Sequence, residues 1–174
     1  FGVTPASAFG FAWFGVLLGP VFHRYRDGYR FGELAMRLAE KQDFVASKAK
    51  VLLAKSLLAF WTQSISAAVD LTAAAFRAAI DTGDYTFACY SHNYRVEALL
   101  AGGDNLDEIW REAEVALAFA RKINFRDAAD IVVAQQRFIQ NMRGLTAHFS
   151  TYGDANFDEA AFEATLTPDR MATM

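Results

Sequence analysis

Residues 28–38 read GYRFGELAMRL, and within them Gly28, Gly32 and Ala35 stand at intervals of four and three residues. These intervals place three small side chains on one face of an α-helix, because a helix turns once in about 3.6 residues. The same intervals occur again at Leu71, Ala75 and Ala78 and at Ala113, Leu117 and Ala120. The last residues of successive triplets are 43 and 42 residues apart. A near-constant period of this length predicts stacked pairs of helices.

A large apolar residue precedes the last residue of each triplet by 21 positions: Phe14, Leu57 and Leu99. We expect the small residues to let two helices approach closely and the large residue to fill the space between layers. The alternative is that the spacing arises by chance in a chain rich in alanine. We favour the repeat, which is an architecture that presents extended surfaces for binding other proteins.

The 174 residues match one domain of ordinary size and are enough to bury a core. Proline occurs only at positions 5, 20 and 168, so residues 21–167 can form long helices. The net charge of −3 offers no basic surplus for phosphate groups, which argues against nucleic acid as a partner. The single cysteine, Cys89, excludes an internal disulfide and a multi-cysteine metal site, and a reducing cytoplasmic location is the simplest interpretation.

The first 22 residues carry no charged side chain, which raises the question of a membrane span. A spanning helix needs about 20 residues, whereas Pro5 and Pro20 leave room for only about 14. No basic segment precedes this stretch, as a signal peptide would require. We therefore expect a buried first helix and no membrane insertion. Because the chain begins with Phe1 rather than Met, we also expect a segment of a longer protein, with apolar ends that neighbouring repeats would cover.

Cap residues and glycines divide the chain into seven main helices and one short terminal helix. We predict them over residues 5–19, 28–42, 44–60, 64–82, 85–101, 106–122, 126–144 and 157–166. The expected capping side chains are Asp27, Asp43, Thr62 or Ser64, Asp84, Asn105 and Asn156. We assign residues 1–149 to a helical-repeat domain, and residues 150–174 to a loop, a short capping helix and a flexible tail after Thr167.

Residues 28–38 resemble the second helix of a tetratricopeptide (TPR) repeat, in which a small residue, a larger residue and alanine occupy the same spacing. Phe11, Phe14 and Gly15 stand where the first helix of that repeat carries its aromatic, large apolar and glycine positions. The period departs from the usual 34 residues, and Gly32 stands where an aromatic residue is usual. The resemblance implies an all-α fold, a right-handed α–α superhelix of stacked antiparallel helix pairs, with about seven helices plus a short C-terminal helix.

Four stretches are similar to the helical-repeat region of very large bacterial multidomain signalling proteins. They are residues 28–38, 78–84 (AAIDTGD), 99–106 (LLAGGDNL) and 156–166 (NFDEAAFEATL). In those proteins a serine/threonine-kinase-like domain and an AAA-type ATPase domain precede the repeats, and GAF and histidine-kinase domains commonly follow. The similarity implies a scaffold or regulatory spacer in signal transduction. It implies no kinase or ATPase activity for these residues themselves.

The sequence contains no motif of the P-loop, dinucleotide-binding, zinc-protease or serine-hydrolase classes. The three histidines, at positions 23, 92 and 148, are far apart in sequence, so we assign no metal site. Cys89 and His92 are three residues apart on one predicted helix, but no third group that would orient them can be named. We therefore predict no catalytic residue, no cofactor and no metal ligand, and a segment that is not an enzyme.

Binding is expected to use aromatic and arginine side chains, which are frequent at binding hot spots. The candidate interaction surface consists of Tyr25, Tyr29, Arg30, Trp61, Tyr90, His92, Tyr94 and Arg95. The structural alternative is that the tyrosines and His92 pack between helices with their polar atoms hydrogen-bonded. A second functional alternative is an all-α sensor domain that binds a small molecule in a pocket near residues 90–95. The expected partner is another protein or another domain of the same chain, and we also expect that exposed apolar ends could support a homodimer.

Overall fold

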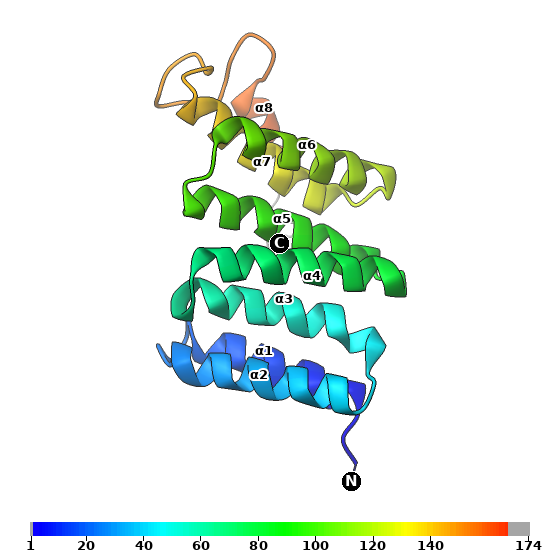
Figure 1. The fold of residues 1–174 in the computed structure, drawn as a ribbon. Coiled ribbons are helices and arrows are strands. Elements are labelled where there is room, and N and C mark those ends of the chain that lie inside the picture. The colour runs from blue at the N-terminus through cyan, green and yellow to red at the C-terminus, as the bar shows by residue number, and fades with distance from the viewer. Residues whose placement is uncertain (1, 167–174) are drawn as a thin grey trace. The chain divides into compact units, whose positions relative to one another are not determined.

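The computed structural model describes residues 2–166, and within them the chain forms eight α-helices and no β-strand (Figure 1). The helices are α1 Pro5–Leu18, α2 Tyr25–Lys41, α3 Val45–Thr62, α4 Ile65–Thr82, α5 Tyr85–Gly102, α6 Leu106–Lys122, α7 Arg126–Met142 and α8 Glu159–Glu163. The all-α fold class and the stacking of successive helices are confirmed, whereas the right-handed superhelix stays a prediction. The tail predicted to be flexible lies outside the described residues.

Glycines and short polar side chains end and begin the middle helices as predicted. Gly83 and Gly103 follow α4 and α5 in the left-handed conformation, with φ of 70° and 74°, which glycine adopts without steric cost. Ser64 and Asp84 cap α4 and α5, because each side chain accepts a hydrogen bond from the backbone N–H three residues further on. Asn105 caps α6 through the N–H two residues further on.

The predicted starts of the second and third helices were wrong in detail. Helix α2 begins at Tyr25, so Asp27 lies in its first turn instead of capping it and pairs with Arg24 at 2.9 Å. An acidic residue is favourable there because the first turn carries a partial positive charge. Helix α3 begins at Val45, and Asp43 has a left-handed backbone with φ of 51°. Asp43 therefore forms the turn between α2 and α3 and does not cap α3.

The chain divides into two compact units, the first ending at Gly103 and the second beginning at Asp104. In the first unit, α1 and α2 form one antiparallel pair, α3 and α4 form the next, and α5 packs against α4 (Figure 1). Helix α3 is central because it contacts α1, α2, α4 and α5. The odd-numbered helices also lie next to one another. Helix α1 contacts α3, and α3 contacts α5, so the three helices form one continuous face. The predicted domain boundary at residue 149 stays a prediction.

Most residues of the three triplets are buried within the helix packing. The buried members are Gly28, Gly32, Ala35, Ala75, Ala113, Leu117 and Ala120. Where α1 crosses α2 the two backbones touch, since a Cβ atom added to Gly15 would lie 2.5 Å from the carbonyl oxygen of Gly28. Only glycine at both positions allows this approach, which is the role expected of Gly28 from the sequence.

The large residue of the first repeat does not fill a gap between layers, contrary to our prediction. Phe14 is 46% exposed and lies edge-on to Phe31, with ring centroids 5.1 Å apart. Leu17, one turn further along α1, is also exposed, whereas Leu57 and Leu99 are half-buried. The reason is that Phe14 lies at the edge of the α1–α2 pair, where Phe31 of α2 covers only part of its ring. None of the helices in this range is both long enough and apolar enough to cross a membrane.

In the second unit α6 packs against α7, and a loop over residues 143–158 leads to α8. Arg143 at the end of α7 pairs with Asp107 in the first turn of α6, at 2.6 Å. The predicted cap Asn156 was wrong, because α8 begins at Glu159 and the side chain of Asp158 accepts the capping hydrogen bond. The terminal helix is therefore shorter than expected.

Candidate docking groove on helices α1, α3 and α5

Aromatic and apolar side chains follow one face of each of α1, α3 and α5. They are Phe9, Trp13 and Val16 on α1, Leu57 and Trp61 on α3, and Phe87, Tyr90 and Tyr94 on α5. Trp13 lies edge-on to Phe87 with ring centroids 6.5 Å apart, and Phe87 lies edge-on to Tyr90 at 5.9 Å. Contacts of this geometry are favourable because the edge of one ring meets the face of the other. The rings therefore join α1 to α5 in one aromatic face.

This face is hollowed into an open groove of about 320 Å³ between α1, α3 and α5. Its lining residues are Val16, Pro20, Leu57, Leu58, Phe60, Trp61, Tyr94 and Glu97. We call it the Trp61 groove. The lining is mostly apolar and contains one charged residue, Glu97, which is the composition typical of binding clefts.

Trp61 lies at the last turn of α3 and is 67% exposed. Its ring is 5.2 Å from that of Tyr25 on α2, at an interplanar angle of 30°. Tyr25 in turn packs against the backbone at Gly19, where an added Cβ would lie 3.0 Å from the Tyr25 ring. The structure thus brings together two residues of the predicted interaction surface. An exposed tryptophan steadied by a neighbouring ring loses little freedom on binding and is a typical hot-spot anchor.

The carboxyl group at the groove belongs to Glu97, which is an exposed residue without a basic partner within residues 2–166. Glu97 lies one turn beyond Tyr94 on α5, and partial burial of its carboxyl group against the groove raises the pKa of Glu97. Within residues 2–166 no Lys, Arg or His forms an ion pair with it. Burial also raises the pKa of the Tyr94 hydroxyl, and the charges of Glu97 and Tyr90 raise it further. This end of the aromatic face therefore carries an uncompensated negative charge.

The opposite end of the aromatic face carries a lysine whose charge is compensated. The Nζ atom of Lys50 lies 3.3 Å from a carboxylate oxygen of Asp84 and 5.2 Å from the centroid of the Phe87 ring. A second hollow of about 260 Å³ lies there, lined by Pro5, Ala6, Phe9, Ala46, Ser47 and Lys50. The aromatic face thus continues from the Trp61 groove toward the N-terminal ends of α1 and α3.

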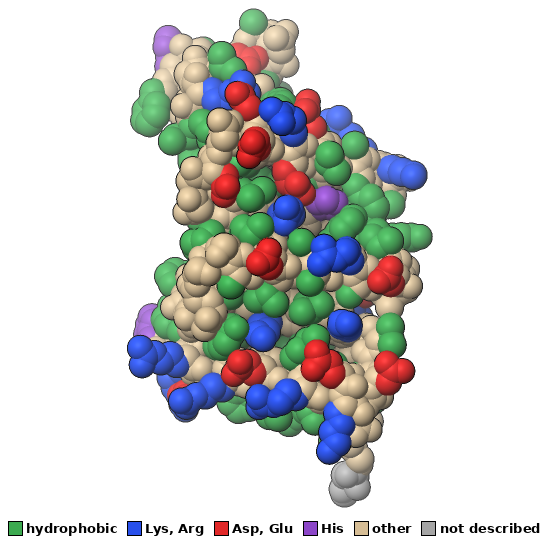
Figure 2. All heavy atoms as spheres, viewed as in Figure 1, with side chains coloured by type: hydrophobic (Ala, Val, Ile, Leu, Met, Phe, Trp, Pro, Cys, Tyr) green, Lys and Arg blue, Asp and Glu red, His purple; other side chains and the backbone are tan. Residues whose placement is uncertain are grey.

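Two predicted surface residues on α2 do not line the groove. The Nζ atom of Lys55 lies over the ring of Tyr29 at 5.3 Å, and Arg30 pairs with Asp27 at 3.4 Å. Figure 2 shows that α2 and α4 present interleaved basic and acidic side chains. Their exposed charged residues are Arg26, Arg30, Arg37, Glu40, Lys41, Asp70, Arg77 and Asp81. Mixed charge of this kind is typical of a solvated surface.

The predicted cluster at residues 90–95 does not converge on one pocket. Tyr90 and Tyr94 pack against the core beneath the aromatic face. His92 is buried against Phe76 of α4, with ring centroids 4.1 Å apart. Arg95 donates a hydrogen bond to the carbonyl oxygen of Val69 in α4, at 3.1 Å. Helix α5 therefore places Tyr94 at the groove and directs His92 and Arg95 toward α4.

Cys89 is buried and held in its neutral form. It is 1% exposed, and burial raises the pKa of its thiol to about 11. Because the thiolate is the reactive species, we expect iodoacetamide at about pH 8 to alkylate the folded chain about 100-fold more slowly than the urea-unfolded chain. Mass spectrometry of the adduct over time gives both rates. Equal rates would show that Cys89 is accessible and ionised.

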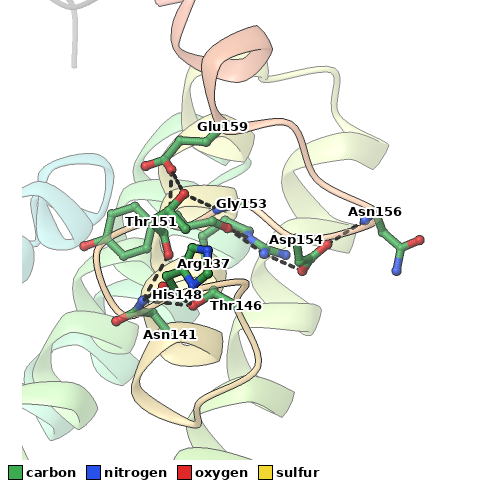
Figure 3. Close-up of polar contacts among 10 residues, drawn as sticks. Arg137, Asn141, Thr146, His148, Thr151, Gly153, Asp154, Asn156 and Glu159 are labelled. Atoms are coloured by element: carbon green, nitrogen blue, oxygen red, sulfur yellow. Dashed lines mark hydrogen bonds and ion pairs between the residues drawn. The ribbon is translucent and has the colours of Figure 1, made fainter.

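The second unit contains a polar network that the sequence did not reveal (Figure 3). Arg137 of α7 is 8% exposed and donates two hydrogen bonds to the carbonyl oxygen of Tyr152, at 2.8 and 2.6 Å. It also pairs with Asp154 at 2.5 Å and stacks over the ring of Phe157 at 4.4 Å. The hydrogen bond from Arg137 lowers the pKa of Asp154. One arginine thus fixes three positions of the loop.

Two further side chains complete this network (Figure 3). The amide nitrogen of Asn141 lies near the carbonyl oxygens of Phe149 and Thr151, each at 3.1 Å. Glu159 accepts hydrogen bonds from the hydroxyl of Thr151 and the backbone N–H of Tyr152, which lower the pKa of its carboxyl group. These contacts hold the loop in one conformation, and they identify the network as structural support.

Glu97, Phe60 and Pro20 line the groove but were absent from the predicted surface. A sequence signal for Glu97 exists, because it continues the helical spacing of Tyr90 and Tyr94 by three residues. No comparable signal marks Phe60 or Pro20, whose places depend on how α1 and α3 pack.

No family model matches the chain, and no solved structure matches it. Among curated proteins it is similar to hybrid signal transduction histidine kinase G of Dictyostelium discoideum, with 29% identity over 146 residues. The match covers 82% of this chain and 4% of that kinase. The chain therefore spans only a small part of the length of the relative it matches.

Proposed function

We propose that this chain is a non-catalytic, TPR-like interaction module of a larger cytoplasmic signalling protein, and that the Trp61 groove holds a peptide segment of another domain or protein. The observation that carries the proposal is the aromatic face that runs across α1, α3 and α5 and opens into this groove beside an exposed Trp61. A face built from alternate helices is an extended surface of the kind that helical stacks use for binding.

Three further facts support the proposal. The groove is open to solvent, which suits a peptide better than the enclosed pocket expected of a small-molecule sensor. The net charge of −3 gives no overall excess of positive charge for nucleic acid. The similar protein is by its name a signal transduction kinase, and the match covers 4% of its length, which suits one module among many.

Self-association is a separate proposal that would use a different surface. Phe14 and Leu17 are 46% and 55% exposed on the outer side of α1. Contiguous exposed apolar side chains of this kind often mark interaction sites. A homodimer through this surface would leave the Trp61 groove open, so the two proposals are compatible.

The groove is tested by selecting binders from a phage-displayed library of random peptides and measuring their affinity by fluorescence anisotropy. We expect Trp61→Ala to weaken binding by about 30-fold, the loss of about 2 kcal/mol that defines a hot spot. Because Trp61 is 67% exposed, the substitution should leave the thermal stability almost unchanged.

The matched control is Phe149→Ala, which removes an 84% exposed aromatic side chain from the loop of the second unit. It should leave the affinity unchanged. Selected peptides that bind Trp61→Ala as tightly as the parent chain, but lose affinity for Phe149→Ala, would move the docking surface to the second unit and contradict the proposal.

A further inference from the structure

Glu97 is the one charged residue in the lining of the Trp61 groove, and no basic side chain pairs with it within residues 2–166. Asp27 pairs with Arg24 at 2.9 Å, and Asp84 pairs with Lys50 at 3.3 Å. Glu97 instead faces a groove lined by Leu57, Trp61 and Tyr94, and no ion pair to it exists within residues 2–166. Glu97 is exposed, so its carboxylate is hydrated until a ligand covers the groove, and a cation on that ligand would then replace the lost water.

The surroundings of Glu97 strengthen the negative potential. Trp61 lies in the last turn of α3, and Pro20 lies two residues after the end of α1. The C-terminal ends of helices carry partial negative charge, so the ends of α1 and α3 add to the charge of Glu97. The faces of the Trp61 and Tyr94 rings are also electron-rich and attract cations. Three independent features thus favour a positive group in one place.

We propose that the Trp61 groove selects peptides with a lysine or arginine side chain, which enters between Trp61 and Tyr94 and pairs with Glu97, while apolar side chains of the peptide lie along the aromatic face. This inference deepens the proposed function and rests on it. The partner is thus a peptide that carries a basic side chain, and the peptide lies in one orientation along the aromatic face.

The orientation of the bound peptide follows from the charges at the two ends of the aromatic face. Lys50 already has Asp84 as its partner, so this end does not require an acidic side chain from the peptide. Glu97 is the one charged residue lining the Trp61 groove, and no basic side chain pairs with it within residues 2–166. The basic side chain of the peptide is therefore placed at the Glu97 end and its apolar residues point toward the Lys50 end.

The test uses the peptides selected from the phage library and one substitution on each side of the contact. The selected peptides should share a lysine or arginine at a fixed distance from apolar residues. Glu97→Gln should weaken their binding by about 10-fold or more. Replacing the shared basic residue of the peptide by methionine should remove most of the difference between the parent chain and Glu97→Gln, because the two groups act as a pair.

The control for charge is Asp70→Asn, which removes the same charge from an exposed position on α4 and should leave the affinity unchanged. Thermal unfolding should show Glu97→Gln to be about as stable as the parent chain, because Glu97 is exposed and the substitution breaks no ion pair. A loss of affinity in Glu97→Gln therefore cannot come from unfolding.

Two results separate the failure of this inference from that of the proposed function. If Trp61→Ala weakens binding while Glu97→Gln does not, or if the selected peptides lack a shared basic residue, the groove is the docking site but the pairing with Glu97 is overturned. If neither substitution affects binding, the proposed function fails together with the inference.

Discussion

Replacing Gly28 by alanine is expected to lower the free energy of unfolding of the first unit by about 2–3 kcal/mol, the upper part of the range for overpacked cores. A methyl group at this position would clash with the carbonyl oxygen of Gly15 and would lie 3.0 Å from a side-chain carbon of Leu58. A backbone carbonyl within a helix cannot rotate away, so α1 must move away from α2. The measurement is urea unfolding followed by circular dichroism.

The matched control is Gly32→Ala, one turn further along the same helix. A Cβ atom at Gly32 would meet its nearest neighbour, in Lys55, at 3.6 Å, which is ordinary van der Waals contact. Alanine is also favoured over glycine within a helix, so we expect Gly32→Ala to stabilise the chain by about 0.5–1 kcal/mol. Changes of the same sign for the two substitutions would contradict the close crossing of α1 and α2.

Replacing Arg137 by methionine is expected to release the loop over residues 143–158 while leaving α6 and α7 folded. The substitution removes both hydrogen bonds to the carbonyl oxygen of Tyr152 and leaves Asp154 without its ion-pair partner. A hydrogen bond to a charged group contributes about 1.5–3 kcal/mol. We therefore expect the backbone N–H groups of the loop to exchange with solvent about 30-fold faster, measured by hydrogen–deuterium exchange and mass spectrometry.

The N–H groups that report this change are hydrogen-bonded within the loop. Ala147 donates to the carbonyl oxygen of Gly153 at 2.9 Å, and Asp154 donates to that of Phe157 at 3.1 Å. Arg126→Met is the control, because Arg126 is 67% exposed and lies 3.8 Å from Asp130, a pair of the kind that contributes less than about 0.5 kcal/mol. Loop exchange that is equally slow in Arg137→Met and in the parent chain would show that Arg137 does not hold the loop.

The helices were predictable because local signals at both ends agreed with the periodicity between them. Gly83 with Asp84, and Gly103 with Asn105, mark their turns by residue type alone. The starts of α2 and α3 were missed because Arg24 and Phe44 stand at the cap positions without a capping side chain. The start of such a helix is determined by packing and by the conformation of the preceding turn. Neither can be inferred from the residue types at the cap position.

The site was predictable only in part, because a helix separates residues that are adjacent in sequence. Tyr90 and Tyr94 share a face, whereas His92 lies two residues from each and points toward α4. Glu97 was overlooked because an exposed glutamate near the end of a helix carries no local sign that an apolar groove lies beside it. The contacts of Arg137 span 15 and 17 residues of sequence, and no local pattern announces them.

The central claim, that the groove on α1, α3 and α5 is the docking surface, is tested most directly by the indole N–H signals of the chain's three tryptophans in a ¹⁵N-correlated NMR spectrum. Trp61 lines the groove, Trp13 belongs to the same aromatic face, and Trp110 lies on α6 in the second unit and serves as an internal reference. We expect titration with a selected peptide to shift the Trp61 signal most and the Trp13 signal less, and to leave Trp110 in place. A saturating peptide that shifts Trp110, or that leaves the Trp61 signal unmoved, would contradict the account.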